Sequence, residues 1–123
     1  MQRLQRRSLL LGSGMALAAP GLARAQTGEI AVGATVPLTG PLAGSGQQYH
    51  FSLQLARDDI NAAGGINGRR LRIAFEDTQA SNSIAVNAFV KLVRELNPPF
   101  VFLSSLSTQN LATEPEVTRA QMP

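Results

Sequence analysis

Three short segments of the chain are dominated by apolar residues and have the length of β-strands. They cover residues 29–36, 71–77 and 100–103. In the second segment Leu71, Ile73 and Phe75 alternate with more polar residues, as in a strand with one buried face. The other two segments are apolar at most positions, which is typical of strands covered on both faces in a parallel sheet.

Between and after these strands, apolar residues recur at steps of three and four, which is the spacing of one helix face. Helices are predicted from Gln47 to Ala63, from the segment 81–83 to Leu96 and from the segment 104–108 to about Gln121. Their predicted buried positions are Tyr49, Leu53, Ala56, Ile60 and Ala63 in the first helix and Ala85, Phe89, Leu92 and Leu96 in the second. Asn61 and the charged residues 57–59 are expected to face water.

Gly and Pro residues separate these elements. The segment 37–46 (PLTGPLAGSG) predicts a loop before the first helix, and Gly64-Gly65 can end that helix because glycine adopts the left-handed conformation freely. Asn97-Pro98-Pro99 ends the second helix. Strand and helix therefore alternate three times, which predicts an α/β fold with right-handed connections and a doubly wound parallel sheet. We expect residues 26–123 to be part of one lobe of a larger protein, because the last helix has no following strand to pack beside.

Residues 1–25 have the three zones of an export signal peptide. Their start is cationic and residues 9–19 are mostly apolar. Residues 23–25 (Ala-Arg-Ala) have small residues at the spacing that a signal peptidase recognises. A membrane anchor is disfavoured because a span needs about 20 apolar residues. The pair Arg6-Arg7 favours the twin-arginine export route, and the Sec route is the alternative. Either route predicts a periplasmic location for the mature chain.

The net charge of +3 does not indicate a nucleic-acid partner. Four of the 11 cationic residues lie within residues 1–25, and all eight acidic residues follow them, so seven cationic and eight acidic residues give the mature chain a net charge of −1. The absence of Cys and the single His exclude a thiolate metal site, a disulfide framework and a Cys nucleophile.

Two loops are candidates for ligand binding. Ligands of open parallel α/β sheets bind beyond the carboxyl ends of the strands, where loops lead into helix N-termini. Residues 39–46 and 104–108 form such loops after the first and third strands. Helix N-termini favour a carboxylate or phosphate, and Ser and Thr hydroxyls can add hydrogen bonds. The alternative is that these hydroxyls only cap the helices.

No pattern of catalytic residues is found in the sequence. The glycines of residues 40–46 fit neither a dinucleotide-binding fingerprint nor a P-loop, and His50 has no nucleophile elbow to accompany it. Glu76-Asp77 is better explained as an acidic strand end that caps a turn or lines a cleft than as a catalytic pair. The arginines of residues 69–72 are expected to form a solvated face. The sequence therefore predicts no enzyme, no catalytic residue, no cofactor and no metal.

Four segments are informative together: the leader with the first strand and PLTGPLA (37–43), the stretch ARDDINAAGGINGRRL (56–71), Glu76-Asp77-Thr78, and the Ser-rich loop after the third strand. In combination they resemble the leucine/isoleucine/valine-binding protein family, the branched-chain amino-acid type of ABC-transporter solute-binding proteins. The second segment is the most specific, and the similarity covers the whole mature chain.

The resemblance implies a hinged, two-lobed protein that closes on one small ligand and delivers it to membrane permease subunits. The chain then holds the first three βα units of a periplasmic binding protein type I lobe. By position, Ser105 looks like the hydroxyl that meets the ligand's carboxylate, and Ser107 and Thr108 are further ligand-binding candidates. Ser45 is similar in position to a Tyr that lines the pocket in several members. Because Ser45 is not aromatic, the resemblance leaves open which ligand side chains the pocket prefers. Gln79 and Ser104 stand where some members have a disulfide.

The sequence thus predicts the substrate-binding component of an ABC transporter for branched-chain or other amino acids or small carboxylates. The alternative is an extracytoplasmic ligand-sensing domain of the same fold in a signalling receptor. A transmembrane helix and a cytoplasmic domain further along the gene would favour the sensor.

Overall fold

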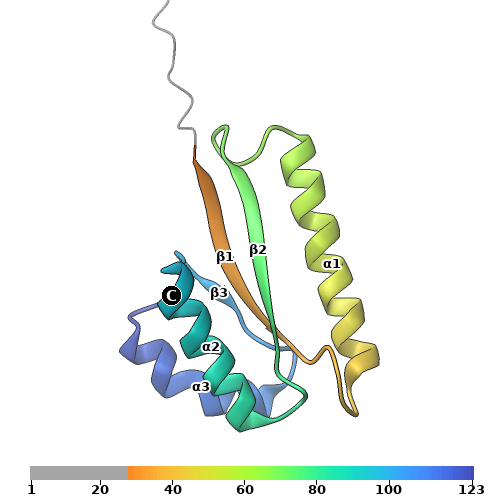
Figure 1. Ribbon diagram of the computed structural model, residues 1–123, viewed down its shortest axis with the longest axis vertical. Coiled ribbons are helices and arrows are strands. Elements are labelled where there is room, and N and C mark those ends of the chain that lie inside the picture. Colours follow the sequence, from red (N-terminus) through yellow and green to blue (C-terminus); the bar gives the residue numbers. More distant parts are fainter. Residues whose placement is uncertain (1–27) are drawn as a thin grey trace, which may run out of the picture.

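A parallel sheet of three strands forms the centre of the protein, with helices on both of its faces (Figure 1). The computed structural model describes residues 28–123, so the predicted signal peptide of residues 1–25 lies outside the described part. The elements are β1 (Glu29–Val36), α1 (Ala43–Ala62), β2 (Arg70–Asp77), α2 (Asn82–Leu96), β3 (Val101–Phe102) and α3 (Ser107–Arg119). The strand order is β2-β1-β3 and both pairings are parallel, which confirms the doubly wound α/β fold.

The central strand β1 is covered on both faces. Its residues Val32–Val36 are all buried, as their near-continuous apolar sequence predicts. On one face they pack with Leu71 and Ile73 of β2 beneath α1. On the other face Gly33 leaves room for Leu92 of α2, because a Cβ atom on that glycine would lie 3.0 Å from the Leu92 Cδ1 atom. The packing on β1 therefore determines how closely the helices approach the sheet.

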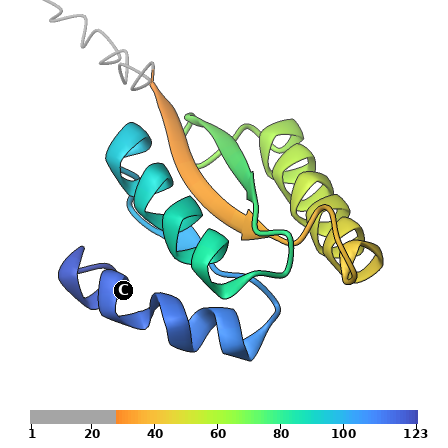
Figure 2. The same cartoon turned by 60° about the horizontal axis from the view of Figure 1, so that its bottom comes forward.

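The helices form layers on either side of the sheet (Figure 2). α1 covers one face, α2 covers the other, and α3 packs on the outside against α2. α2 buries Ala85, Ala88, Phe89 and Leu92, whereas the predicted core position Leu96 is half-buried. Within residues 28–123, α3 packs against no strand. None of the helices in this range combines the length and hydrophobicity that a membrane crossing requires.

α1 begins at Ala43, four residues before its predicted start at Gln47. The prediction was wrong because it assigned the glycines of this segment to a loop. A glycine inside a helix costs about 1 kcal/mol, and packing outweighs that cost here. Gly46 is buried, and its N–H donates to the Leu42 carbonyl oxygen at 3.1 Å. Because it has no side chain, the first turn of α1 can lie directly on Pro37.

The face that α1 turns toward the sheet is narrower than predicted. Tyr49, Leu53 and Ile60 pack on the core. Ala56 and Ala63 were expected in the same stripe, but both are exposed. The helix therefore contacts the sheet through its larger side chains, which reach the core from a greater distance than an alanine can.

Asn61 was expected to face water, and the structure contradicts this. Its Nδ2 donates to the Leu71 carbonyl oxygen at 2.9 Å, and its Oδ1 accepts from the Leu71 N–H at 2.8 Å. β2 is an edge strand in the described sheet, so these two backbone groups have no partner strand. The amide of Asn61 satisfies both of them and joins the end of α1 to the start of β2.

The predicted helix ends are mostly confirmed. Gly64 and Gly65 follow α1 with φ angles of 101° and 77°, and Asn97 ends α2 in the left-handed conformation with φ 44°. β3 comprises only Val101–Phe102, which is shorter than the predicted strand. α3 ends at Arg119, two residues before its predicted end.

We predict that Gly46→Ala strongly destabilises the protein, since the added Cβ atom would overlap the Pro37 carbonyl oxygen. The free energy of unfolding should fall by about 2–4 kcal/mol, measured by urea denaturation of the full-length protein. Gly44→Ala is the matched control, because a Cβ there meets no atom within 4 Å. It should leave stability unchanged or raise it by up to about 1 kcal/mol. Equal effects of the two substitutions would contradict the packing described for α1.

Candidate functional site

The carboxyl ends of the strands lie at one edge of the sheet, and all three helices begin there (Figures 1 and 2). β1 and β2 end in register, with Val36 opposite Asp77. The loops 37–42, 78–81 and 103–106 lead from this edge into α1, α2 and α3. Each helix start presents N–H groups without a helical partner and a partial positive charge. This edge, which we call the carboxyl edge, can therefore attract an anion.

The four hydroxyl residues predicted from the sequence all lie at the carboxyl edge. Ser105 is in the loop before α3, Ser107 and Thr108 are the first residues of α3, and Ser45 is the third residue of α1. All four are exposed, and within residues 28–123 their hydroxyls take part in no hydrogen bond. The N-cap residues of α1 and α3 are leucines without a side-chain cap, so the alternative capping role is wrong for these two helices. These four hydroxyls are therefore not needed for the hydrogen bonds of the described fold.

Tyr49 connects α1 to the loop that carries Ser105. Its hydroxyl donates to the Leu103 carbonyl oxygen at 3.3 Å, and burial raises the pKa of this phenol above its ordinary value. The hydroxyl therefore keeps its proton at neutral pH and remains a donor. Ser45 precedes Tyr49 by four residues and so lies on the same side of α1. Ser45 and Ser105 therefore both lie at the carboxyl edge, although they are 60 residues apart in the sequence.

The Asp77 carboxylate joins the loops after β1 and β2. Its oxygens accept from the N–H groups of Leu38 (2.8 Å), Thr39 (3.2 Å) and Gln79 (2.9 Å), and from the Thr39 hydroxyl (2.5 Å). Burial acts to raise the pKa of Asp77, but these hydrogen bonds outweigh burial, so the pKa lies below its ordinary value. The interpretation of Asp77 as a turn cap at a strand end is confirmed.

Gln109 connects the first turn of α3 to the loop after β2. Its Oε1 accepts from the Thr78 hydroxyl at 3.2 Å, and its Nε2 donates to the Ser81 carbonyl oxygen at 3.3 Å. Gln109 and Thr78 are almost completely buried. Ser104, which precedes Ser105, is also buried, and its hydroxyl accepts from the Leu106 N–H at 3.3 Å. The backbone of this edge is thus held by buried polar groups.

Other polar residues considered from the sequence have structural contacts. His50 is half-buried and meets the Phe75 ring edge-to-face, with ring centroids 4.2 Å apart. The Glu76 carboxylate pairs with the Lys91 ammonium at 2.7 Å. Of the arginines in residues 69–72, Arg69 differs from the expected solvated face, since it is half-buried and donates to the Glu29 carbonyl oxygen at 3.0 Å.

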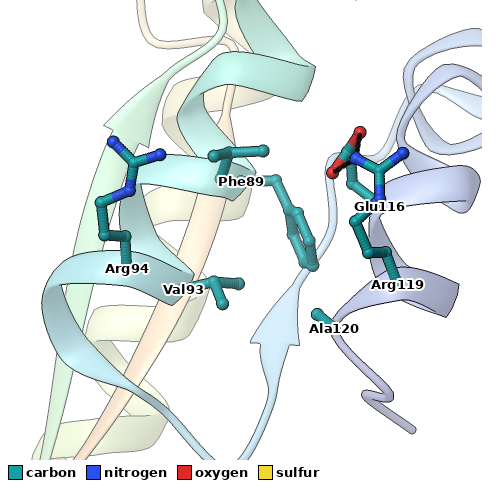
Figure 3. Close-up of a pocket in the computed structure, with 7 residues that line it drawn as sticks. Phe89, Val93, Arg94, Glu116, Arg119 and Ala120 are labelled. Carbon is teal, nitrogen blue, oxygen red and sulfur yellow. Dashed lines mark hydrogen bonds and ion pairs between the residues drawn. The ribbon is translucent and has the colours of Figure 1, made fainter.

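A cavity of about 220 Å³ lies between α2 and α3, away from the four hydroxyl residues (Figure 3). Phe89, Val93 and Arg94 line it from α2, and Glu116 and Arg119, which form an ion pair, line it from α3. None of Ser45, Ser105, Ser107 and Thr108 lines it. Among residues 28–123, no group of three or more His, Asp or Glu side chains could hold a metal ion.

The sequence predicted which hydroxyl residues lie at the carboxyl edge, but it did not identify the side chains that join the loops of this edge. Tyr49 was assigned to the core from helix spacing, and nothing in that spacing shows that its hydroxyl reaches Leu103. Gln109 carried no signal, because a lone glutamine in a polar helix is ordinarily exposed. The inward orientation of Asn61, which bonds both backbone groups of Leu71, could have been suspected from the sequence. Asn61 lies one turn before the glycines that end α1.

The chain belongs to a family of periplasmic binding proteins. Residues 29–123, which form most of the chain, match the family described as "Periplasmic binding protein". A curated relative, the Leu/Ile/Val-binding protein homolog 3 of Brucella melitensis, is 37% identical over 87 residues. That alignment covers 70% of this chain and 24% of the relative.

Solved structures have the same fold. The branched-chain amino acid transporter substrate binding protein LivJ of Streptococcus pneumoniae, in complex with isoleucine, is 29% identical with a TM-score of 0.74. A periplasmic binding protein type 1 of Bordetella pertussis is 28% identical with a TM-score of 0.73. The matches cover 77% of this chain and 27% and 26% of those chains. The chain thus spans about a quarter of the length of the proteins it matches.

We predict that Asp77→Asn lowers the free energy of unfolding by about 1 kcal/mol at pH 7, because it removes the charge from four hydrogen bonds. Since folding lowers the pKa of Asp77, its carboxylate stabilises the fold above the ordinary pKa of about 3.9. This stabilisation is lost as the pH falls through the lower pKa of the folded state. Urea denaturation of wild type and variant at several pH values should therefore give curves that converge below about pH 4.

The matched control is Asp59→Asn, which removes an exposed carboxylate near the end of α1. It should leave stability unchanged or raise it slightly, because a negative charge near a helix C-terminus is unfavourable. If the difference between wild type and Asp77→Asn were the same at every pH, the proposed contribution of the Asp77 charge would be wrong.

Proposed function

We propose that this chain forms the first part of lobe one in the substrate-binding component of an ABC transporter. The proposed ligands are branched-chain amino acids, other amino acids or small carboxylates. The observation that carries the proposal is the carboxyl edge itself, where exposed hydroxyls without hydrogen bonds lie beside the helix N-termini of a rigidly held sheet. Membership of the periplasmic binding protein family and the likeness to an isoleucine-bound relative support it.

The chemistry of the edge suits a carboxylate. The start of α3 offers N–H groups and a positive dipole end, and Ser105, Ser107 and Thr108 add hydroxyl donors. In the proposed function Ser105 binds the carboxylate of the ligand and the other two hydroxyls assist. Ser45 lies on the α1 side and faces the rest of the ligand. A serine there leaves more space than an aromatic residue, which favours a ligand with some bulk.

A second lobe is part of this proposal. Hydrogen bonds to an anion are weak in water and become stronger once water is excluded. In the proposed mechanism the ligand's contacts with both lobes favour a closed hinge state, and permease subunits recognise that closed state. The family is one of periplasmic proteins, and we propose that residues 1–25 direct the protein there by the twin-arginine route.

We predict that the full-length protein binds at least one of isoleucine, leucine, valine, alanine, glutamate or a small monocarboxylate better than millimolar in titration calorimetry. Ser105→Ala should weaken this binding by about 10- to 100-fold, since a hydrogen bond to a charged group contributes about 1.5–3 kcal/mol. Ser52→Ala is the matched control. Its hydroxyl lies in the middle of α1 and donates within the helix to the Gln48 carbonyl oxygen, so binding should not change. Failure of the whole panel to bind would sink the proposal.

A further inference from the structure

Among residues 28–123, one side-chain hydrogen bond joins α1 to the loop that carries Ser105. β3 comprises only two residues, so the sheet itself holds little of the backbone that follows. The Tyr49 hydroxyl reaches the Leu103 carbonyl oxygen, two residues before Ser105. This contact links positions 54 residues apart in the sequence. Tyr49 is thus a direct connection between α1 and the segment between β3 and α3.

The same segment is held from its other side by Gln109. The side chain of Gln109 is 1% exposed and bonds both Thr78 and the Ser81 carbonyl oxygen in the loop after β2. Its own N–H donates to the Leu106 carbonyl oxygen at 3.0 Å, which closes the first turn of α3. A buried amide that lost these partners would leave unsatisfied polar groups, so this arrangement strongly disfavours other positions of the α3 start.

Between these two attachments lie Ser105, Ser107 and Thr108, whose hydroxyls have no partner within residues 28–123. The segment 103–108 therefore combines a fixed backbone with free donors. Binding costs less free energy when the binding groups are already ordered, because less conformational entropy is lost on association. A change that loosens the segment should weaken binding even if it removes no ligand contact.

We infer that Tyr49 and Gln109 are positioning residues that set ligand affinity by fixing the segment 103–108 before the ligand arrives. The inference rests on the proposed function for its ligand, but the fixing of the segment is a property of the ligand-free protein. Because the segment meets the carboxylate that all candidate ligands share, the two residues affect affinity for every ligand by the same factor. They do not select among ligand side chains.

The first experiment measures hydrogen exchange of the segment 103–110 in the ligand-free, full-length protein. Tyr49→Phe removes only the hydroxyl, and Gln109→Leu removes the amide at similar volume. In both variants the Leu106 and Asn110 N–H groups, which are hydrogen-bonded in the structure, should exchange about tenfold faster. Exchange at the Ala63 N–H, at the far end of α1, should not change. Unchanged exchange in the segment 103–110 of both variants would overturn the inference whether or not any ligand binds.

The second experiment measures Kd for isoleucine, leucine and valine by calorimetry. Tyr49→Phe should weaken binding about fivefold and Gln109→Leu about tenfold, by the same factor for each amino acid that binds. Ser52→Ala is matched to Tyr49→Phe, since it removes a hydroxyl from α1. Thr113→Val is matched to Gln109→Leu, because it removes a buried hydroxyl of α3 whose only hydrogen bond within residues 28–123 is to the Gln109 carbonyl oxygen at 2.8 Å. Neither control should change Kd.

The outcomes separate the inference from the proposed function. If wild type binds and both variants bind equally well, the inference is wrong and the proposed function stands. If both variants lower the unfolding midpoint without a change in Kd, the two residues are merely structural. If wild type binds no ligand in the panel, the proposed function fails, and the exchange experiment alone decides whether the segment is held as described. Should Gln109→Leu fail to fold, Tyr49→Phe still gives each of these answers, because it deletes one half-buried oxygen.

Discussion

The burial of β1 on both faces is the constraint on which the rest of the structure depends. A strand between two layers of helix must carry small or compact side chains, and β1 does so with Val32, Gly33 and Ala34. Each right-handed connection returns to the sheet through a helix, so every helix starts at the carboxyl ends of the strands. The carboxyl edge is therefore a consequence of the central strand. Three loops and three helix N-termini meet there, although they lie far apart in the sequence.

Packing alone does not fix the loops at this edge. They are joined by polar contacts that cross between elements: Asp77 with the loop after β1, Gln109 with the loop after β2, and Tyr49 with the loop after β3. Each contact joins residues at least 28 positions apart. The three contacts use carboxylate, amide and phenol groups, and they leave the hydroxyls of Ser105, Ser107 and Thr108 unbonded. The structure thus separates the groups that hold the backbone from those available to a ligand.

The sequence predicted the fold well because the fold depends on local patterns. A short stretch of sequence is enough to recognise an apolar strand, the periodicity of a helix face, or a helix end such as Gly64-Gly65. The structure has strands, helices and a helix end at these places. The prediction failed where contacts between distant segments override local preference. Gly46 is helical because it packs on Pro37, and Asn61 turns inward because Leu71 lies on an edge strand. The side chains that join the loops of the carboxyl edge belong to this second kind. Sequence patterns therefore predicted that the loops meet at one edge, but not the hydrogen bonds that Tyr49 and Gln109 make there.

The state of the hydroxyls also bears on why a second lobe belongs to the proposed function. An exposed hydroxyl or helix N-terminus already bonds water, so exchanging water for a carboxylate gains little while the site stays open. The free energy gained from these hydrogen bonds is larger when the surroundings are less polar. It is reduced when the donors must first be ordered, so donors that are already in place benefit most. Rigidly held loops with free donors are therefore of most use to a protein whose second wall excludes water. In the proposed function, tight binding of a carboxylate requires both ordered donors and exclusion of water. The contacts of Tyr49 and Gln109 order the segment 103–108, and the second lobe excludes the water.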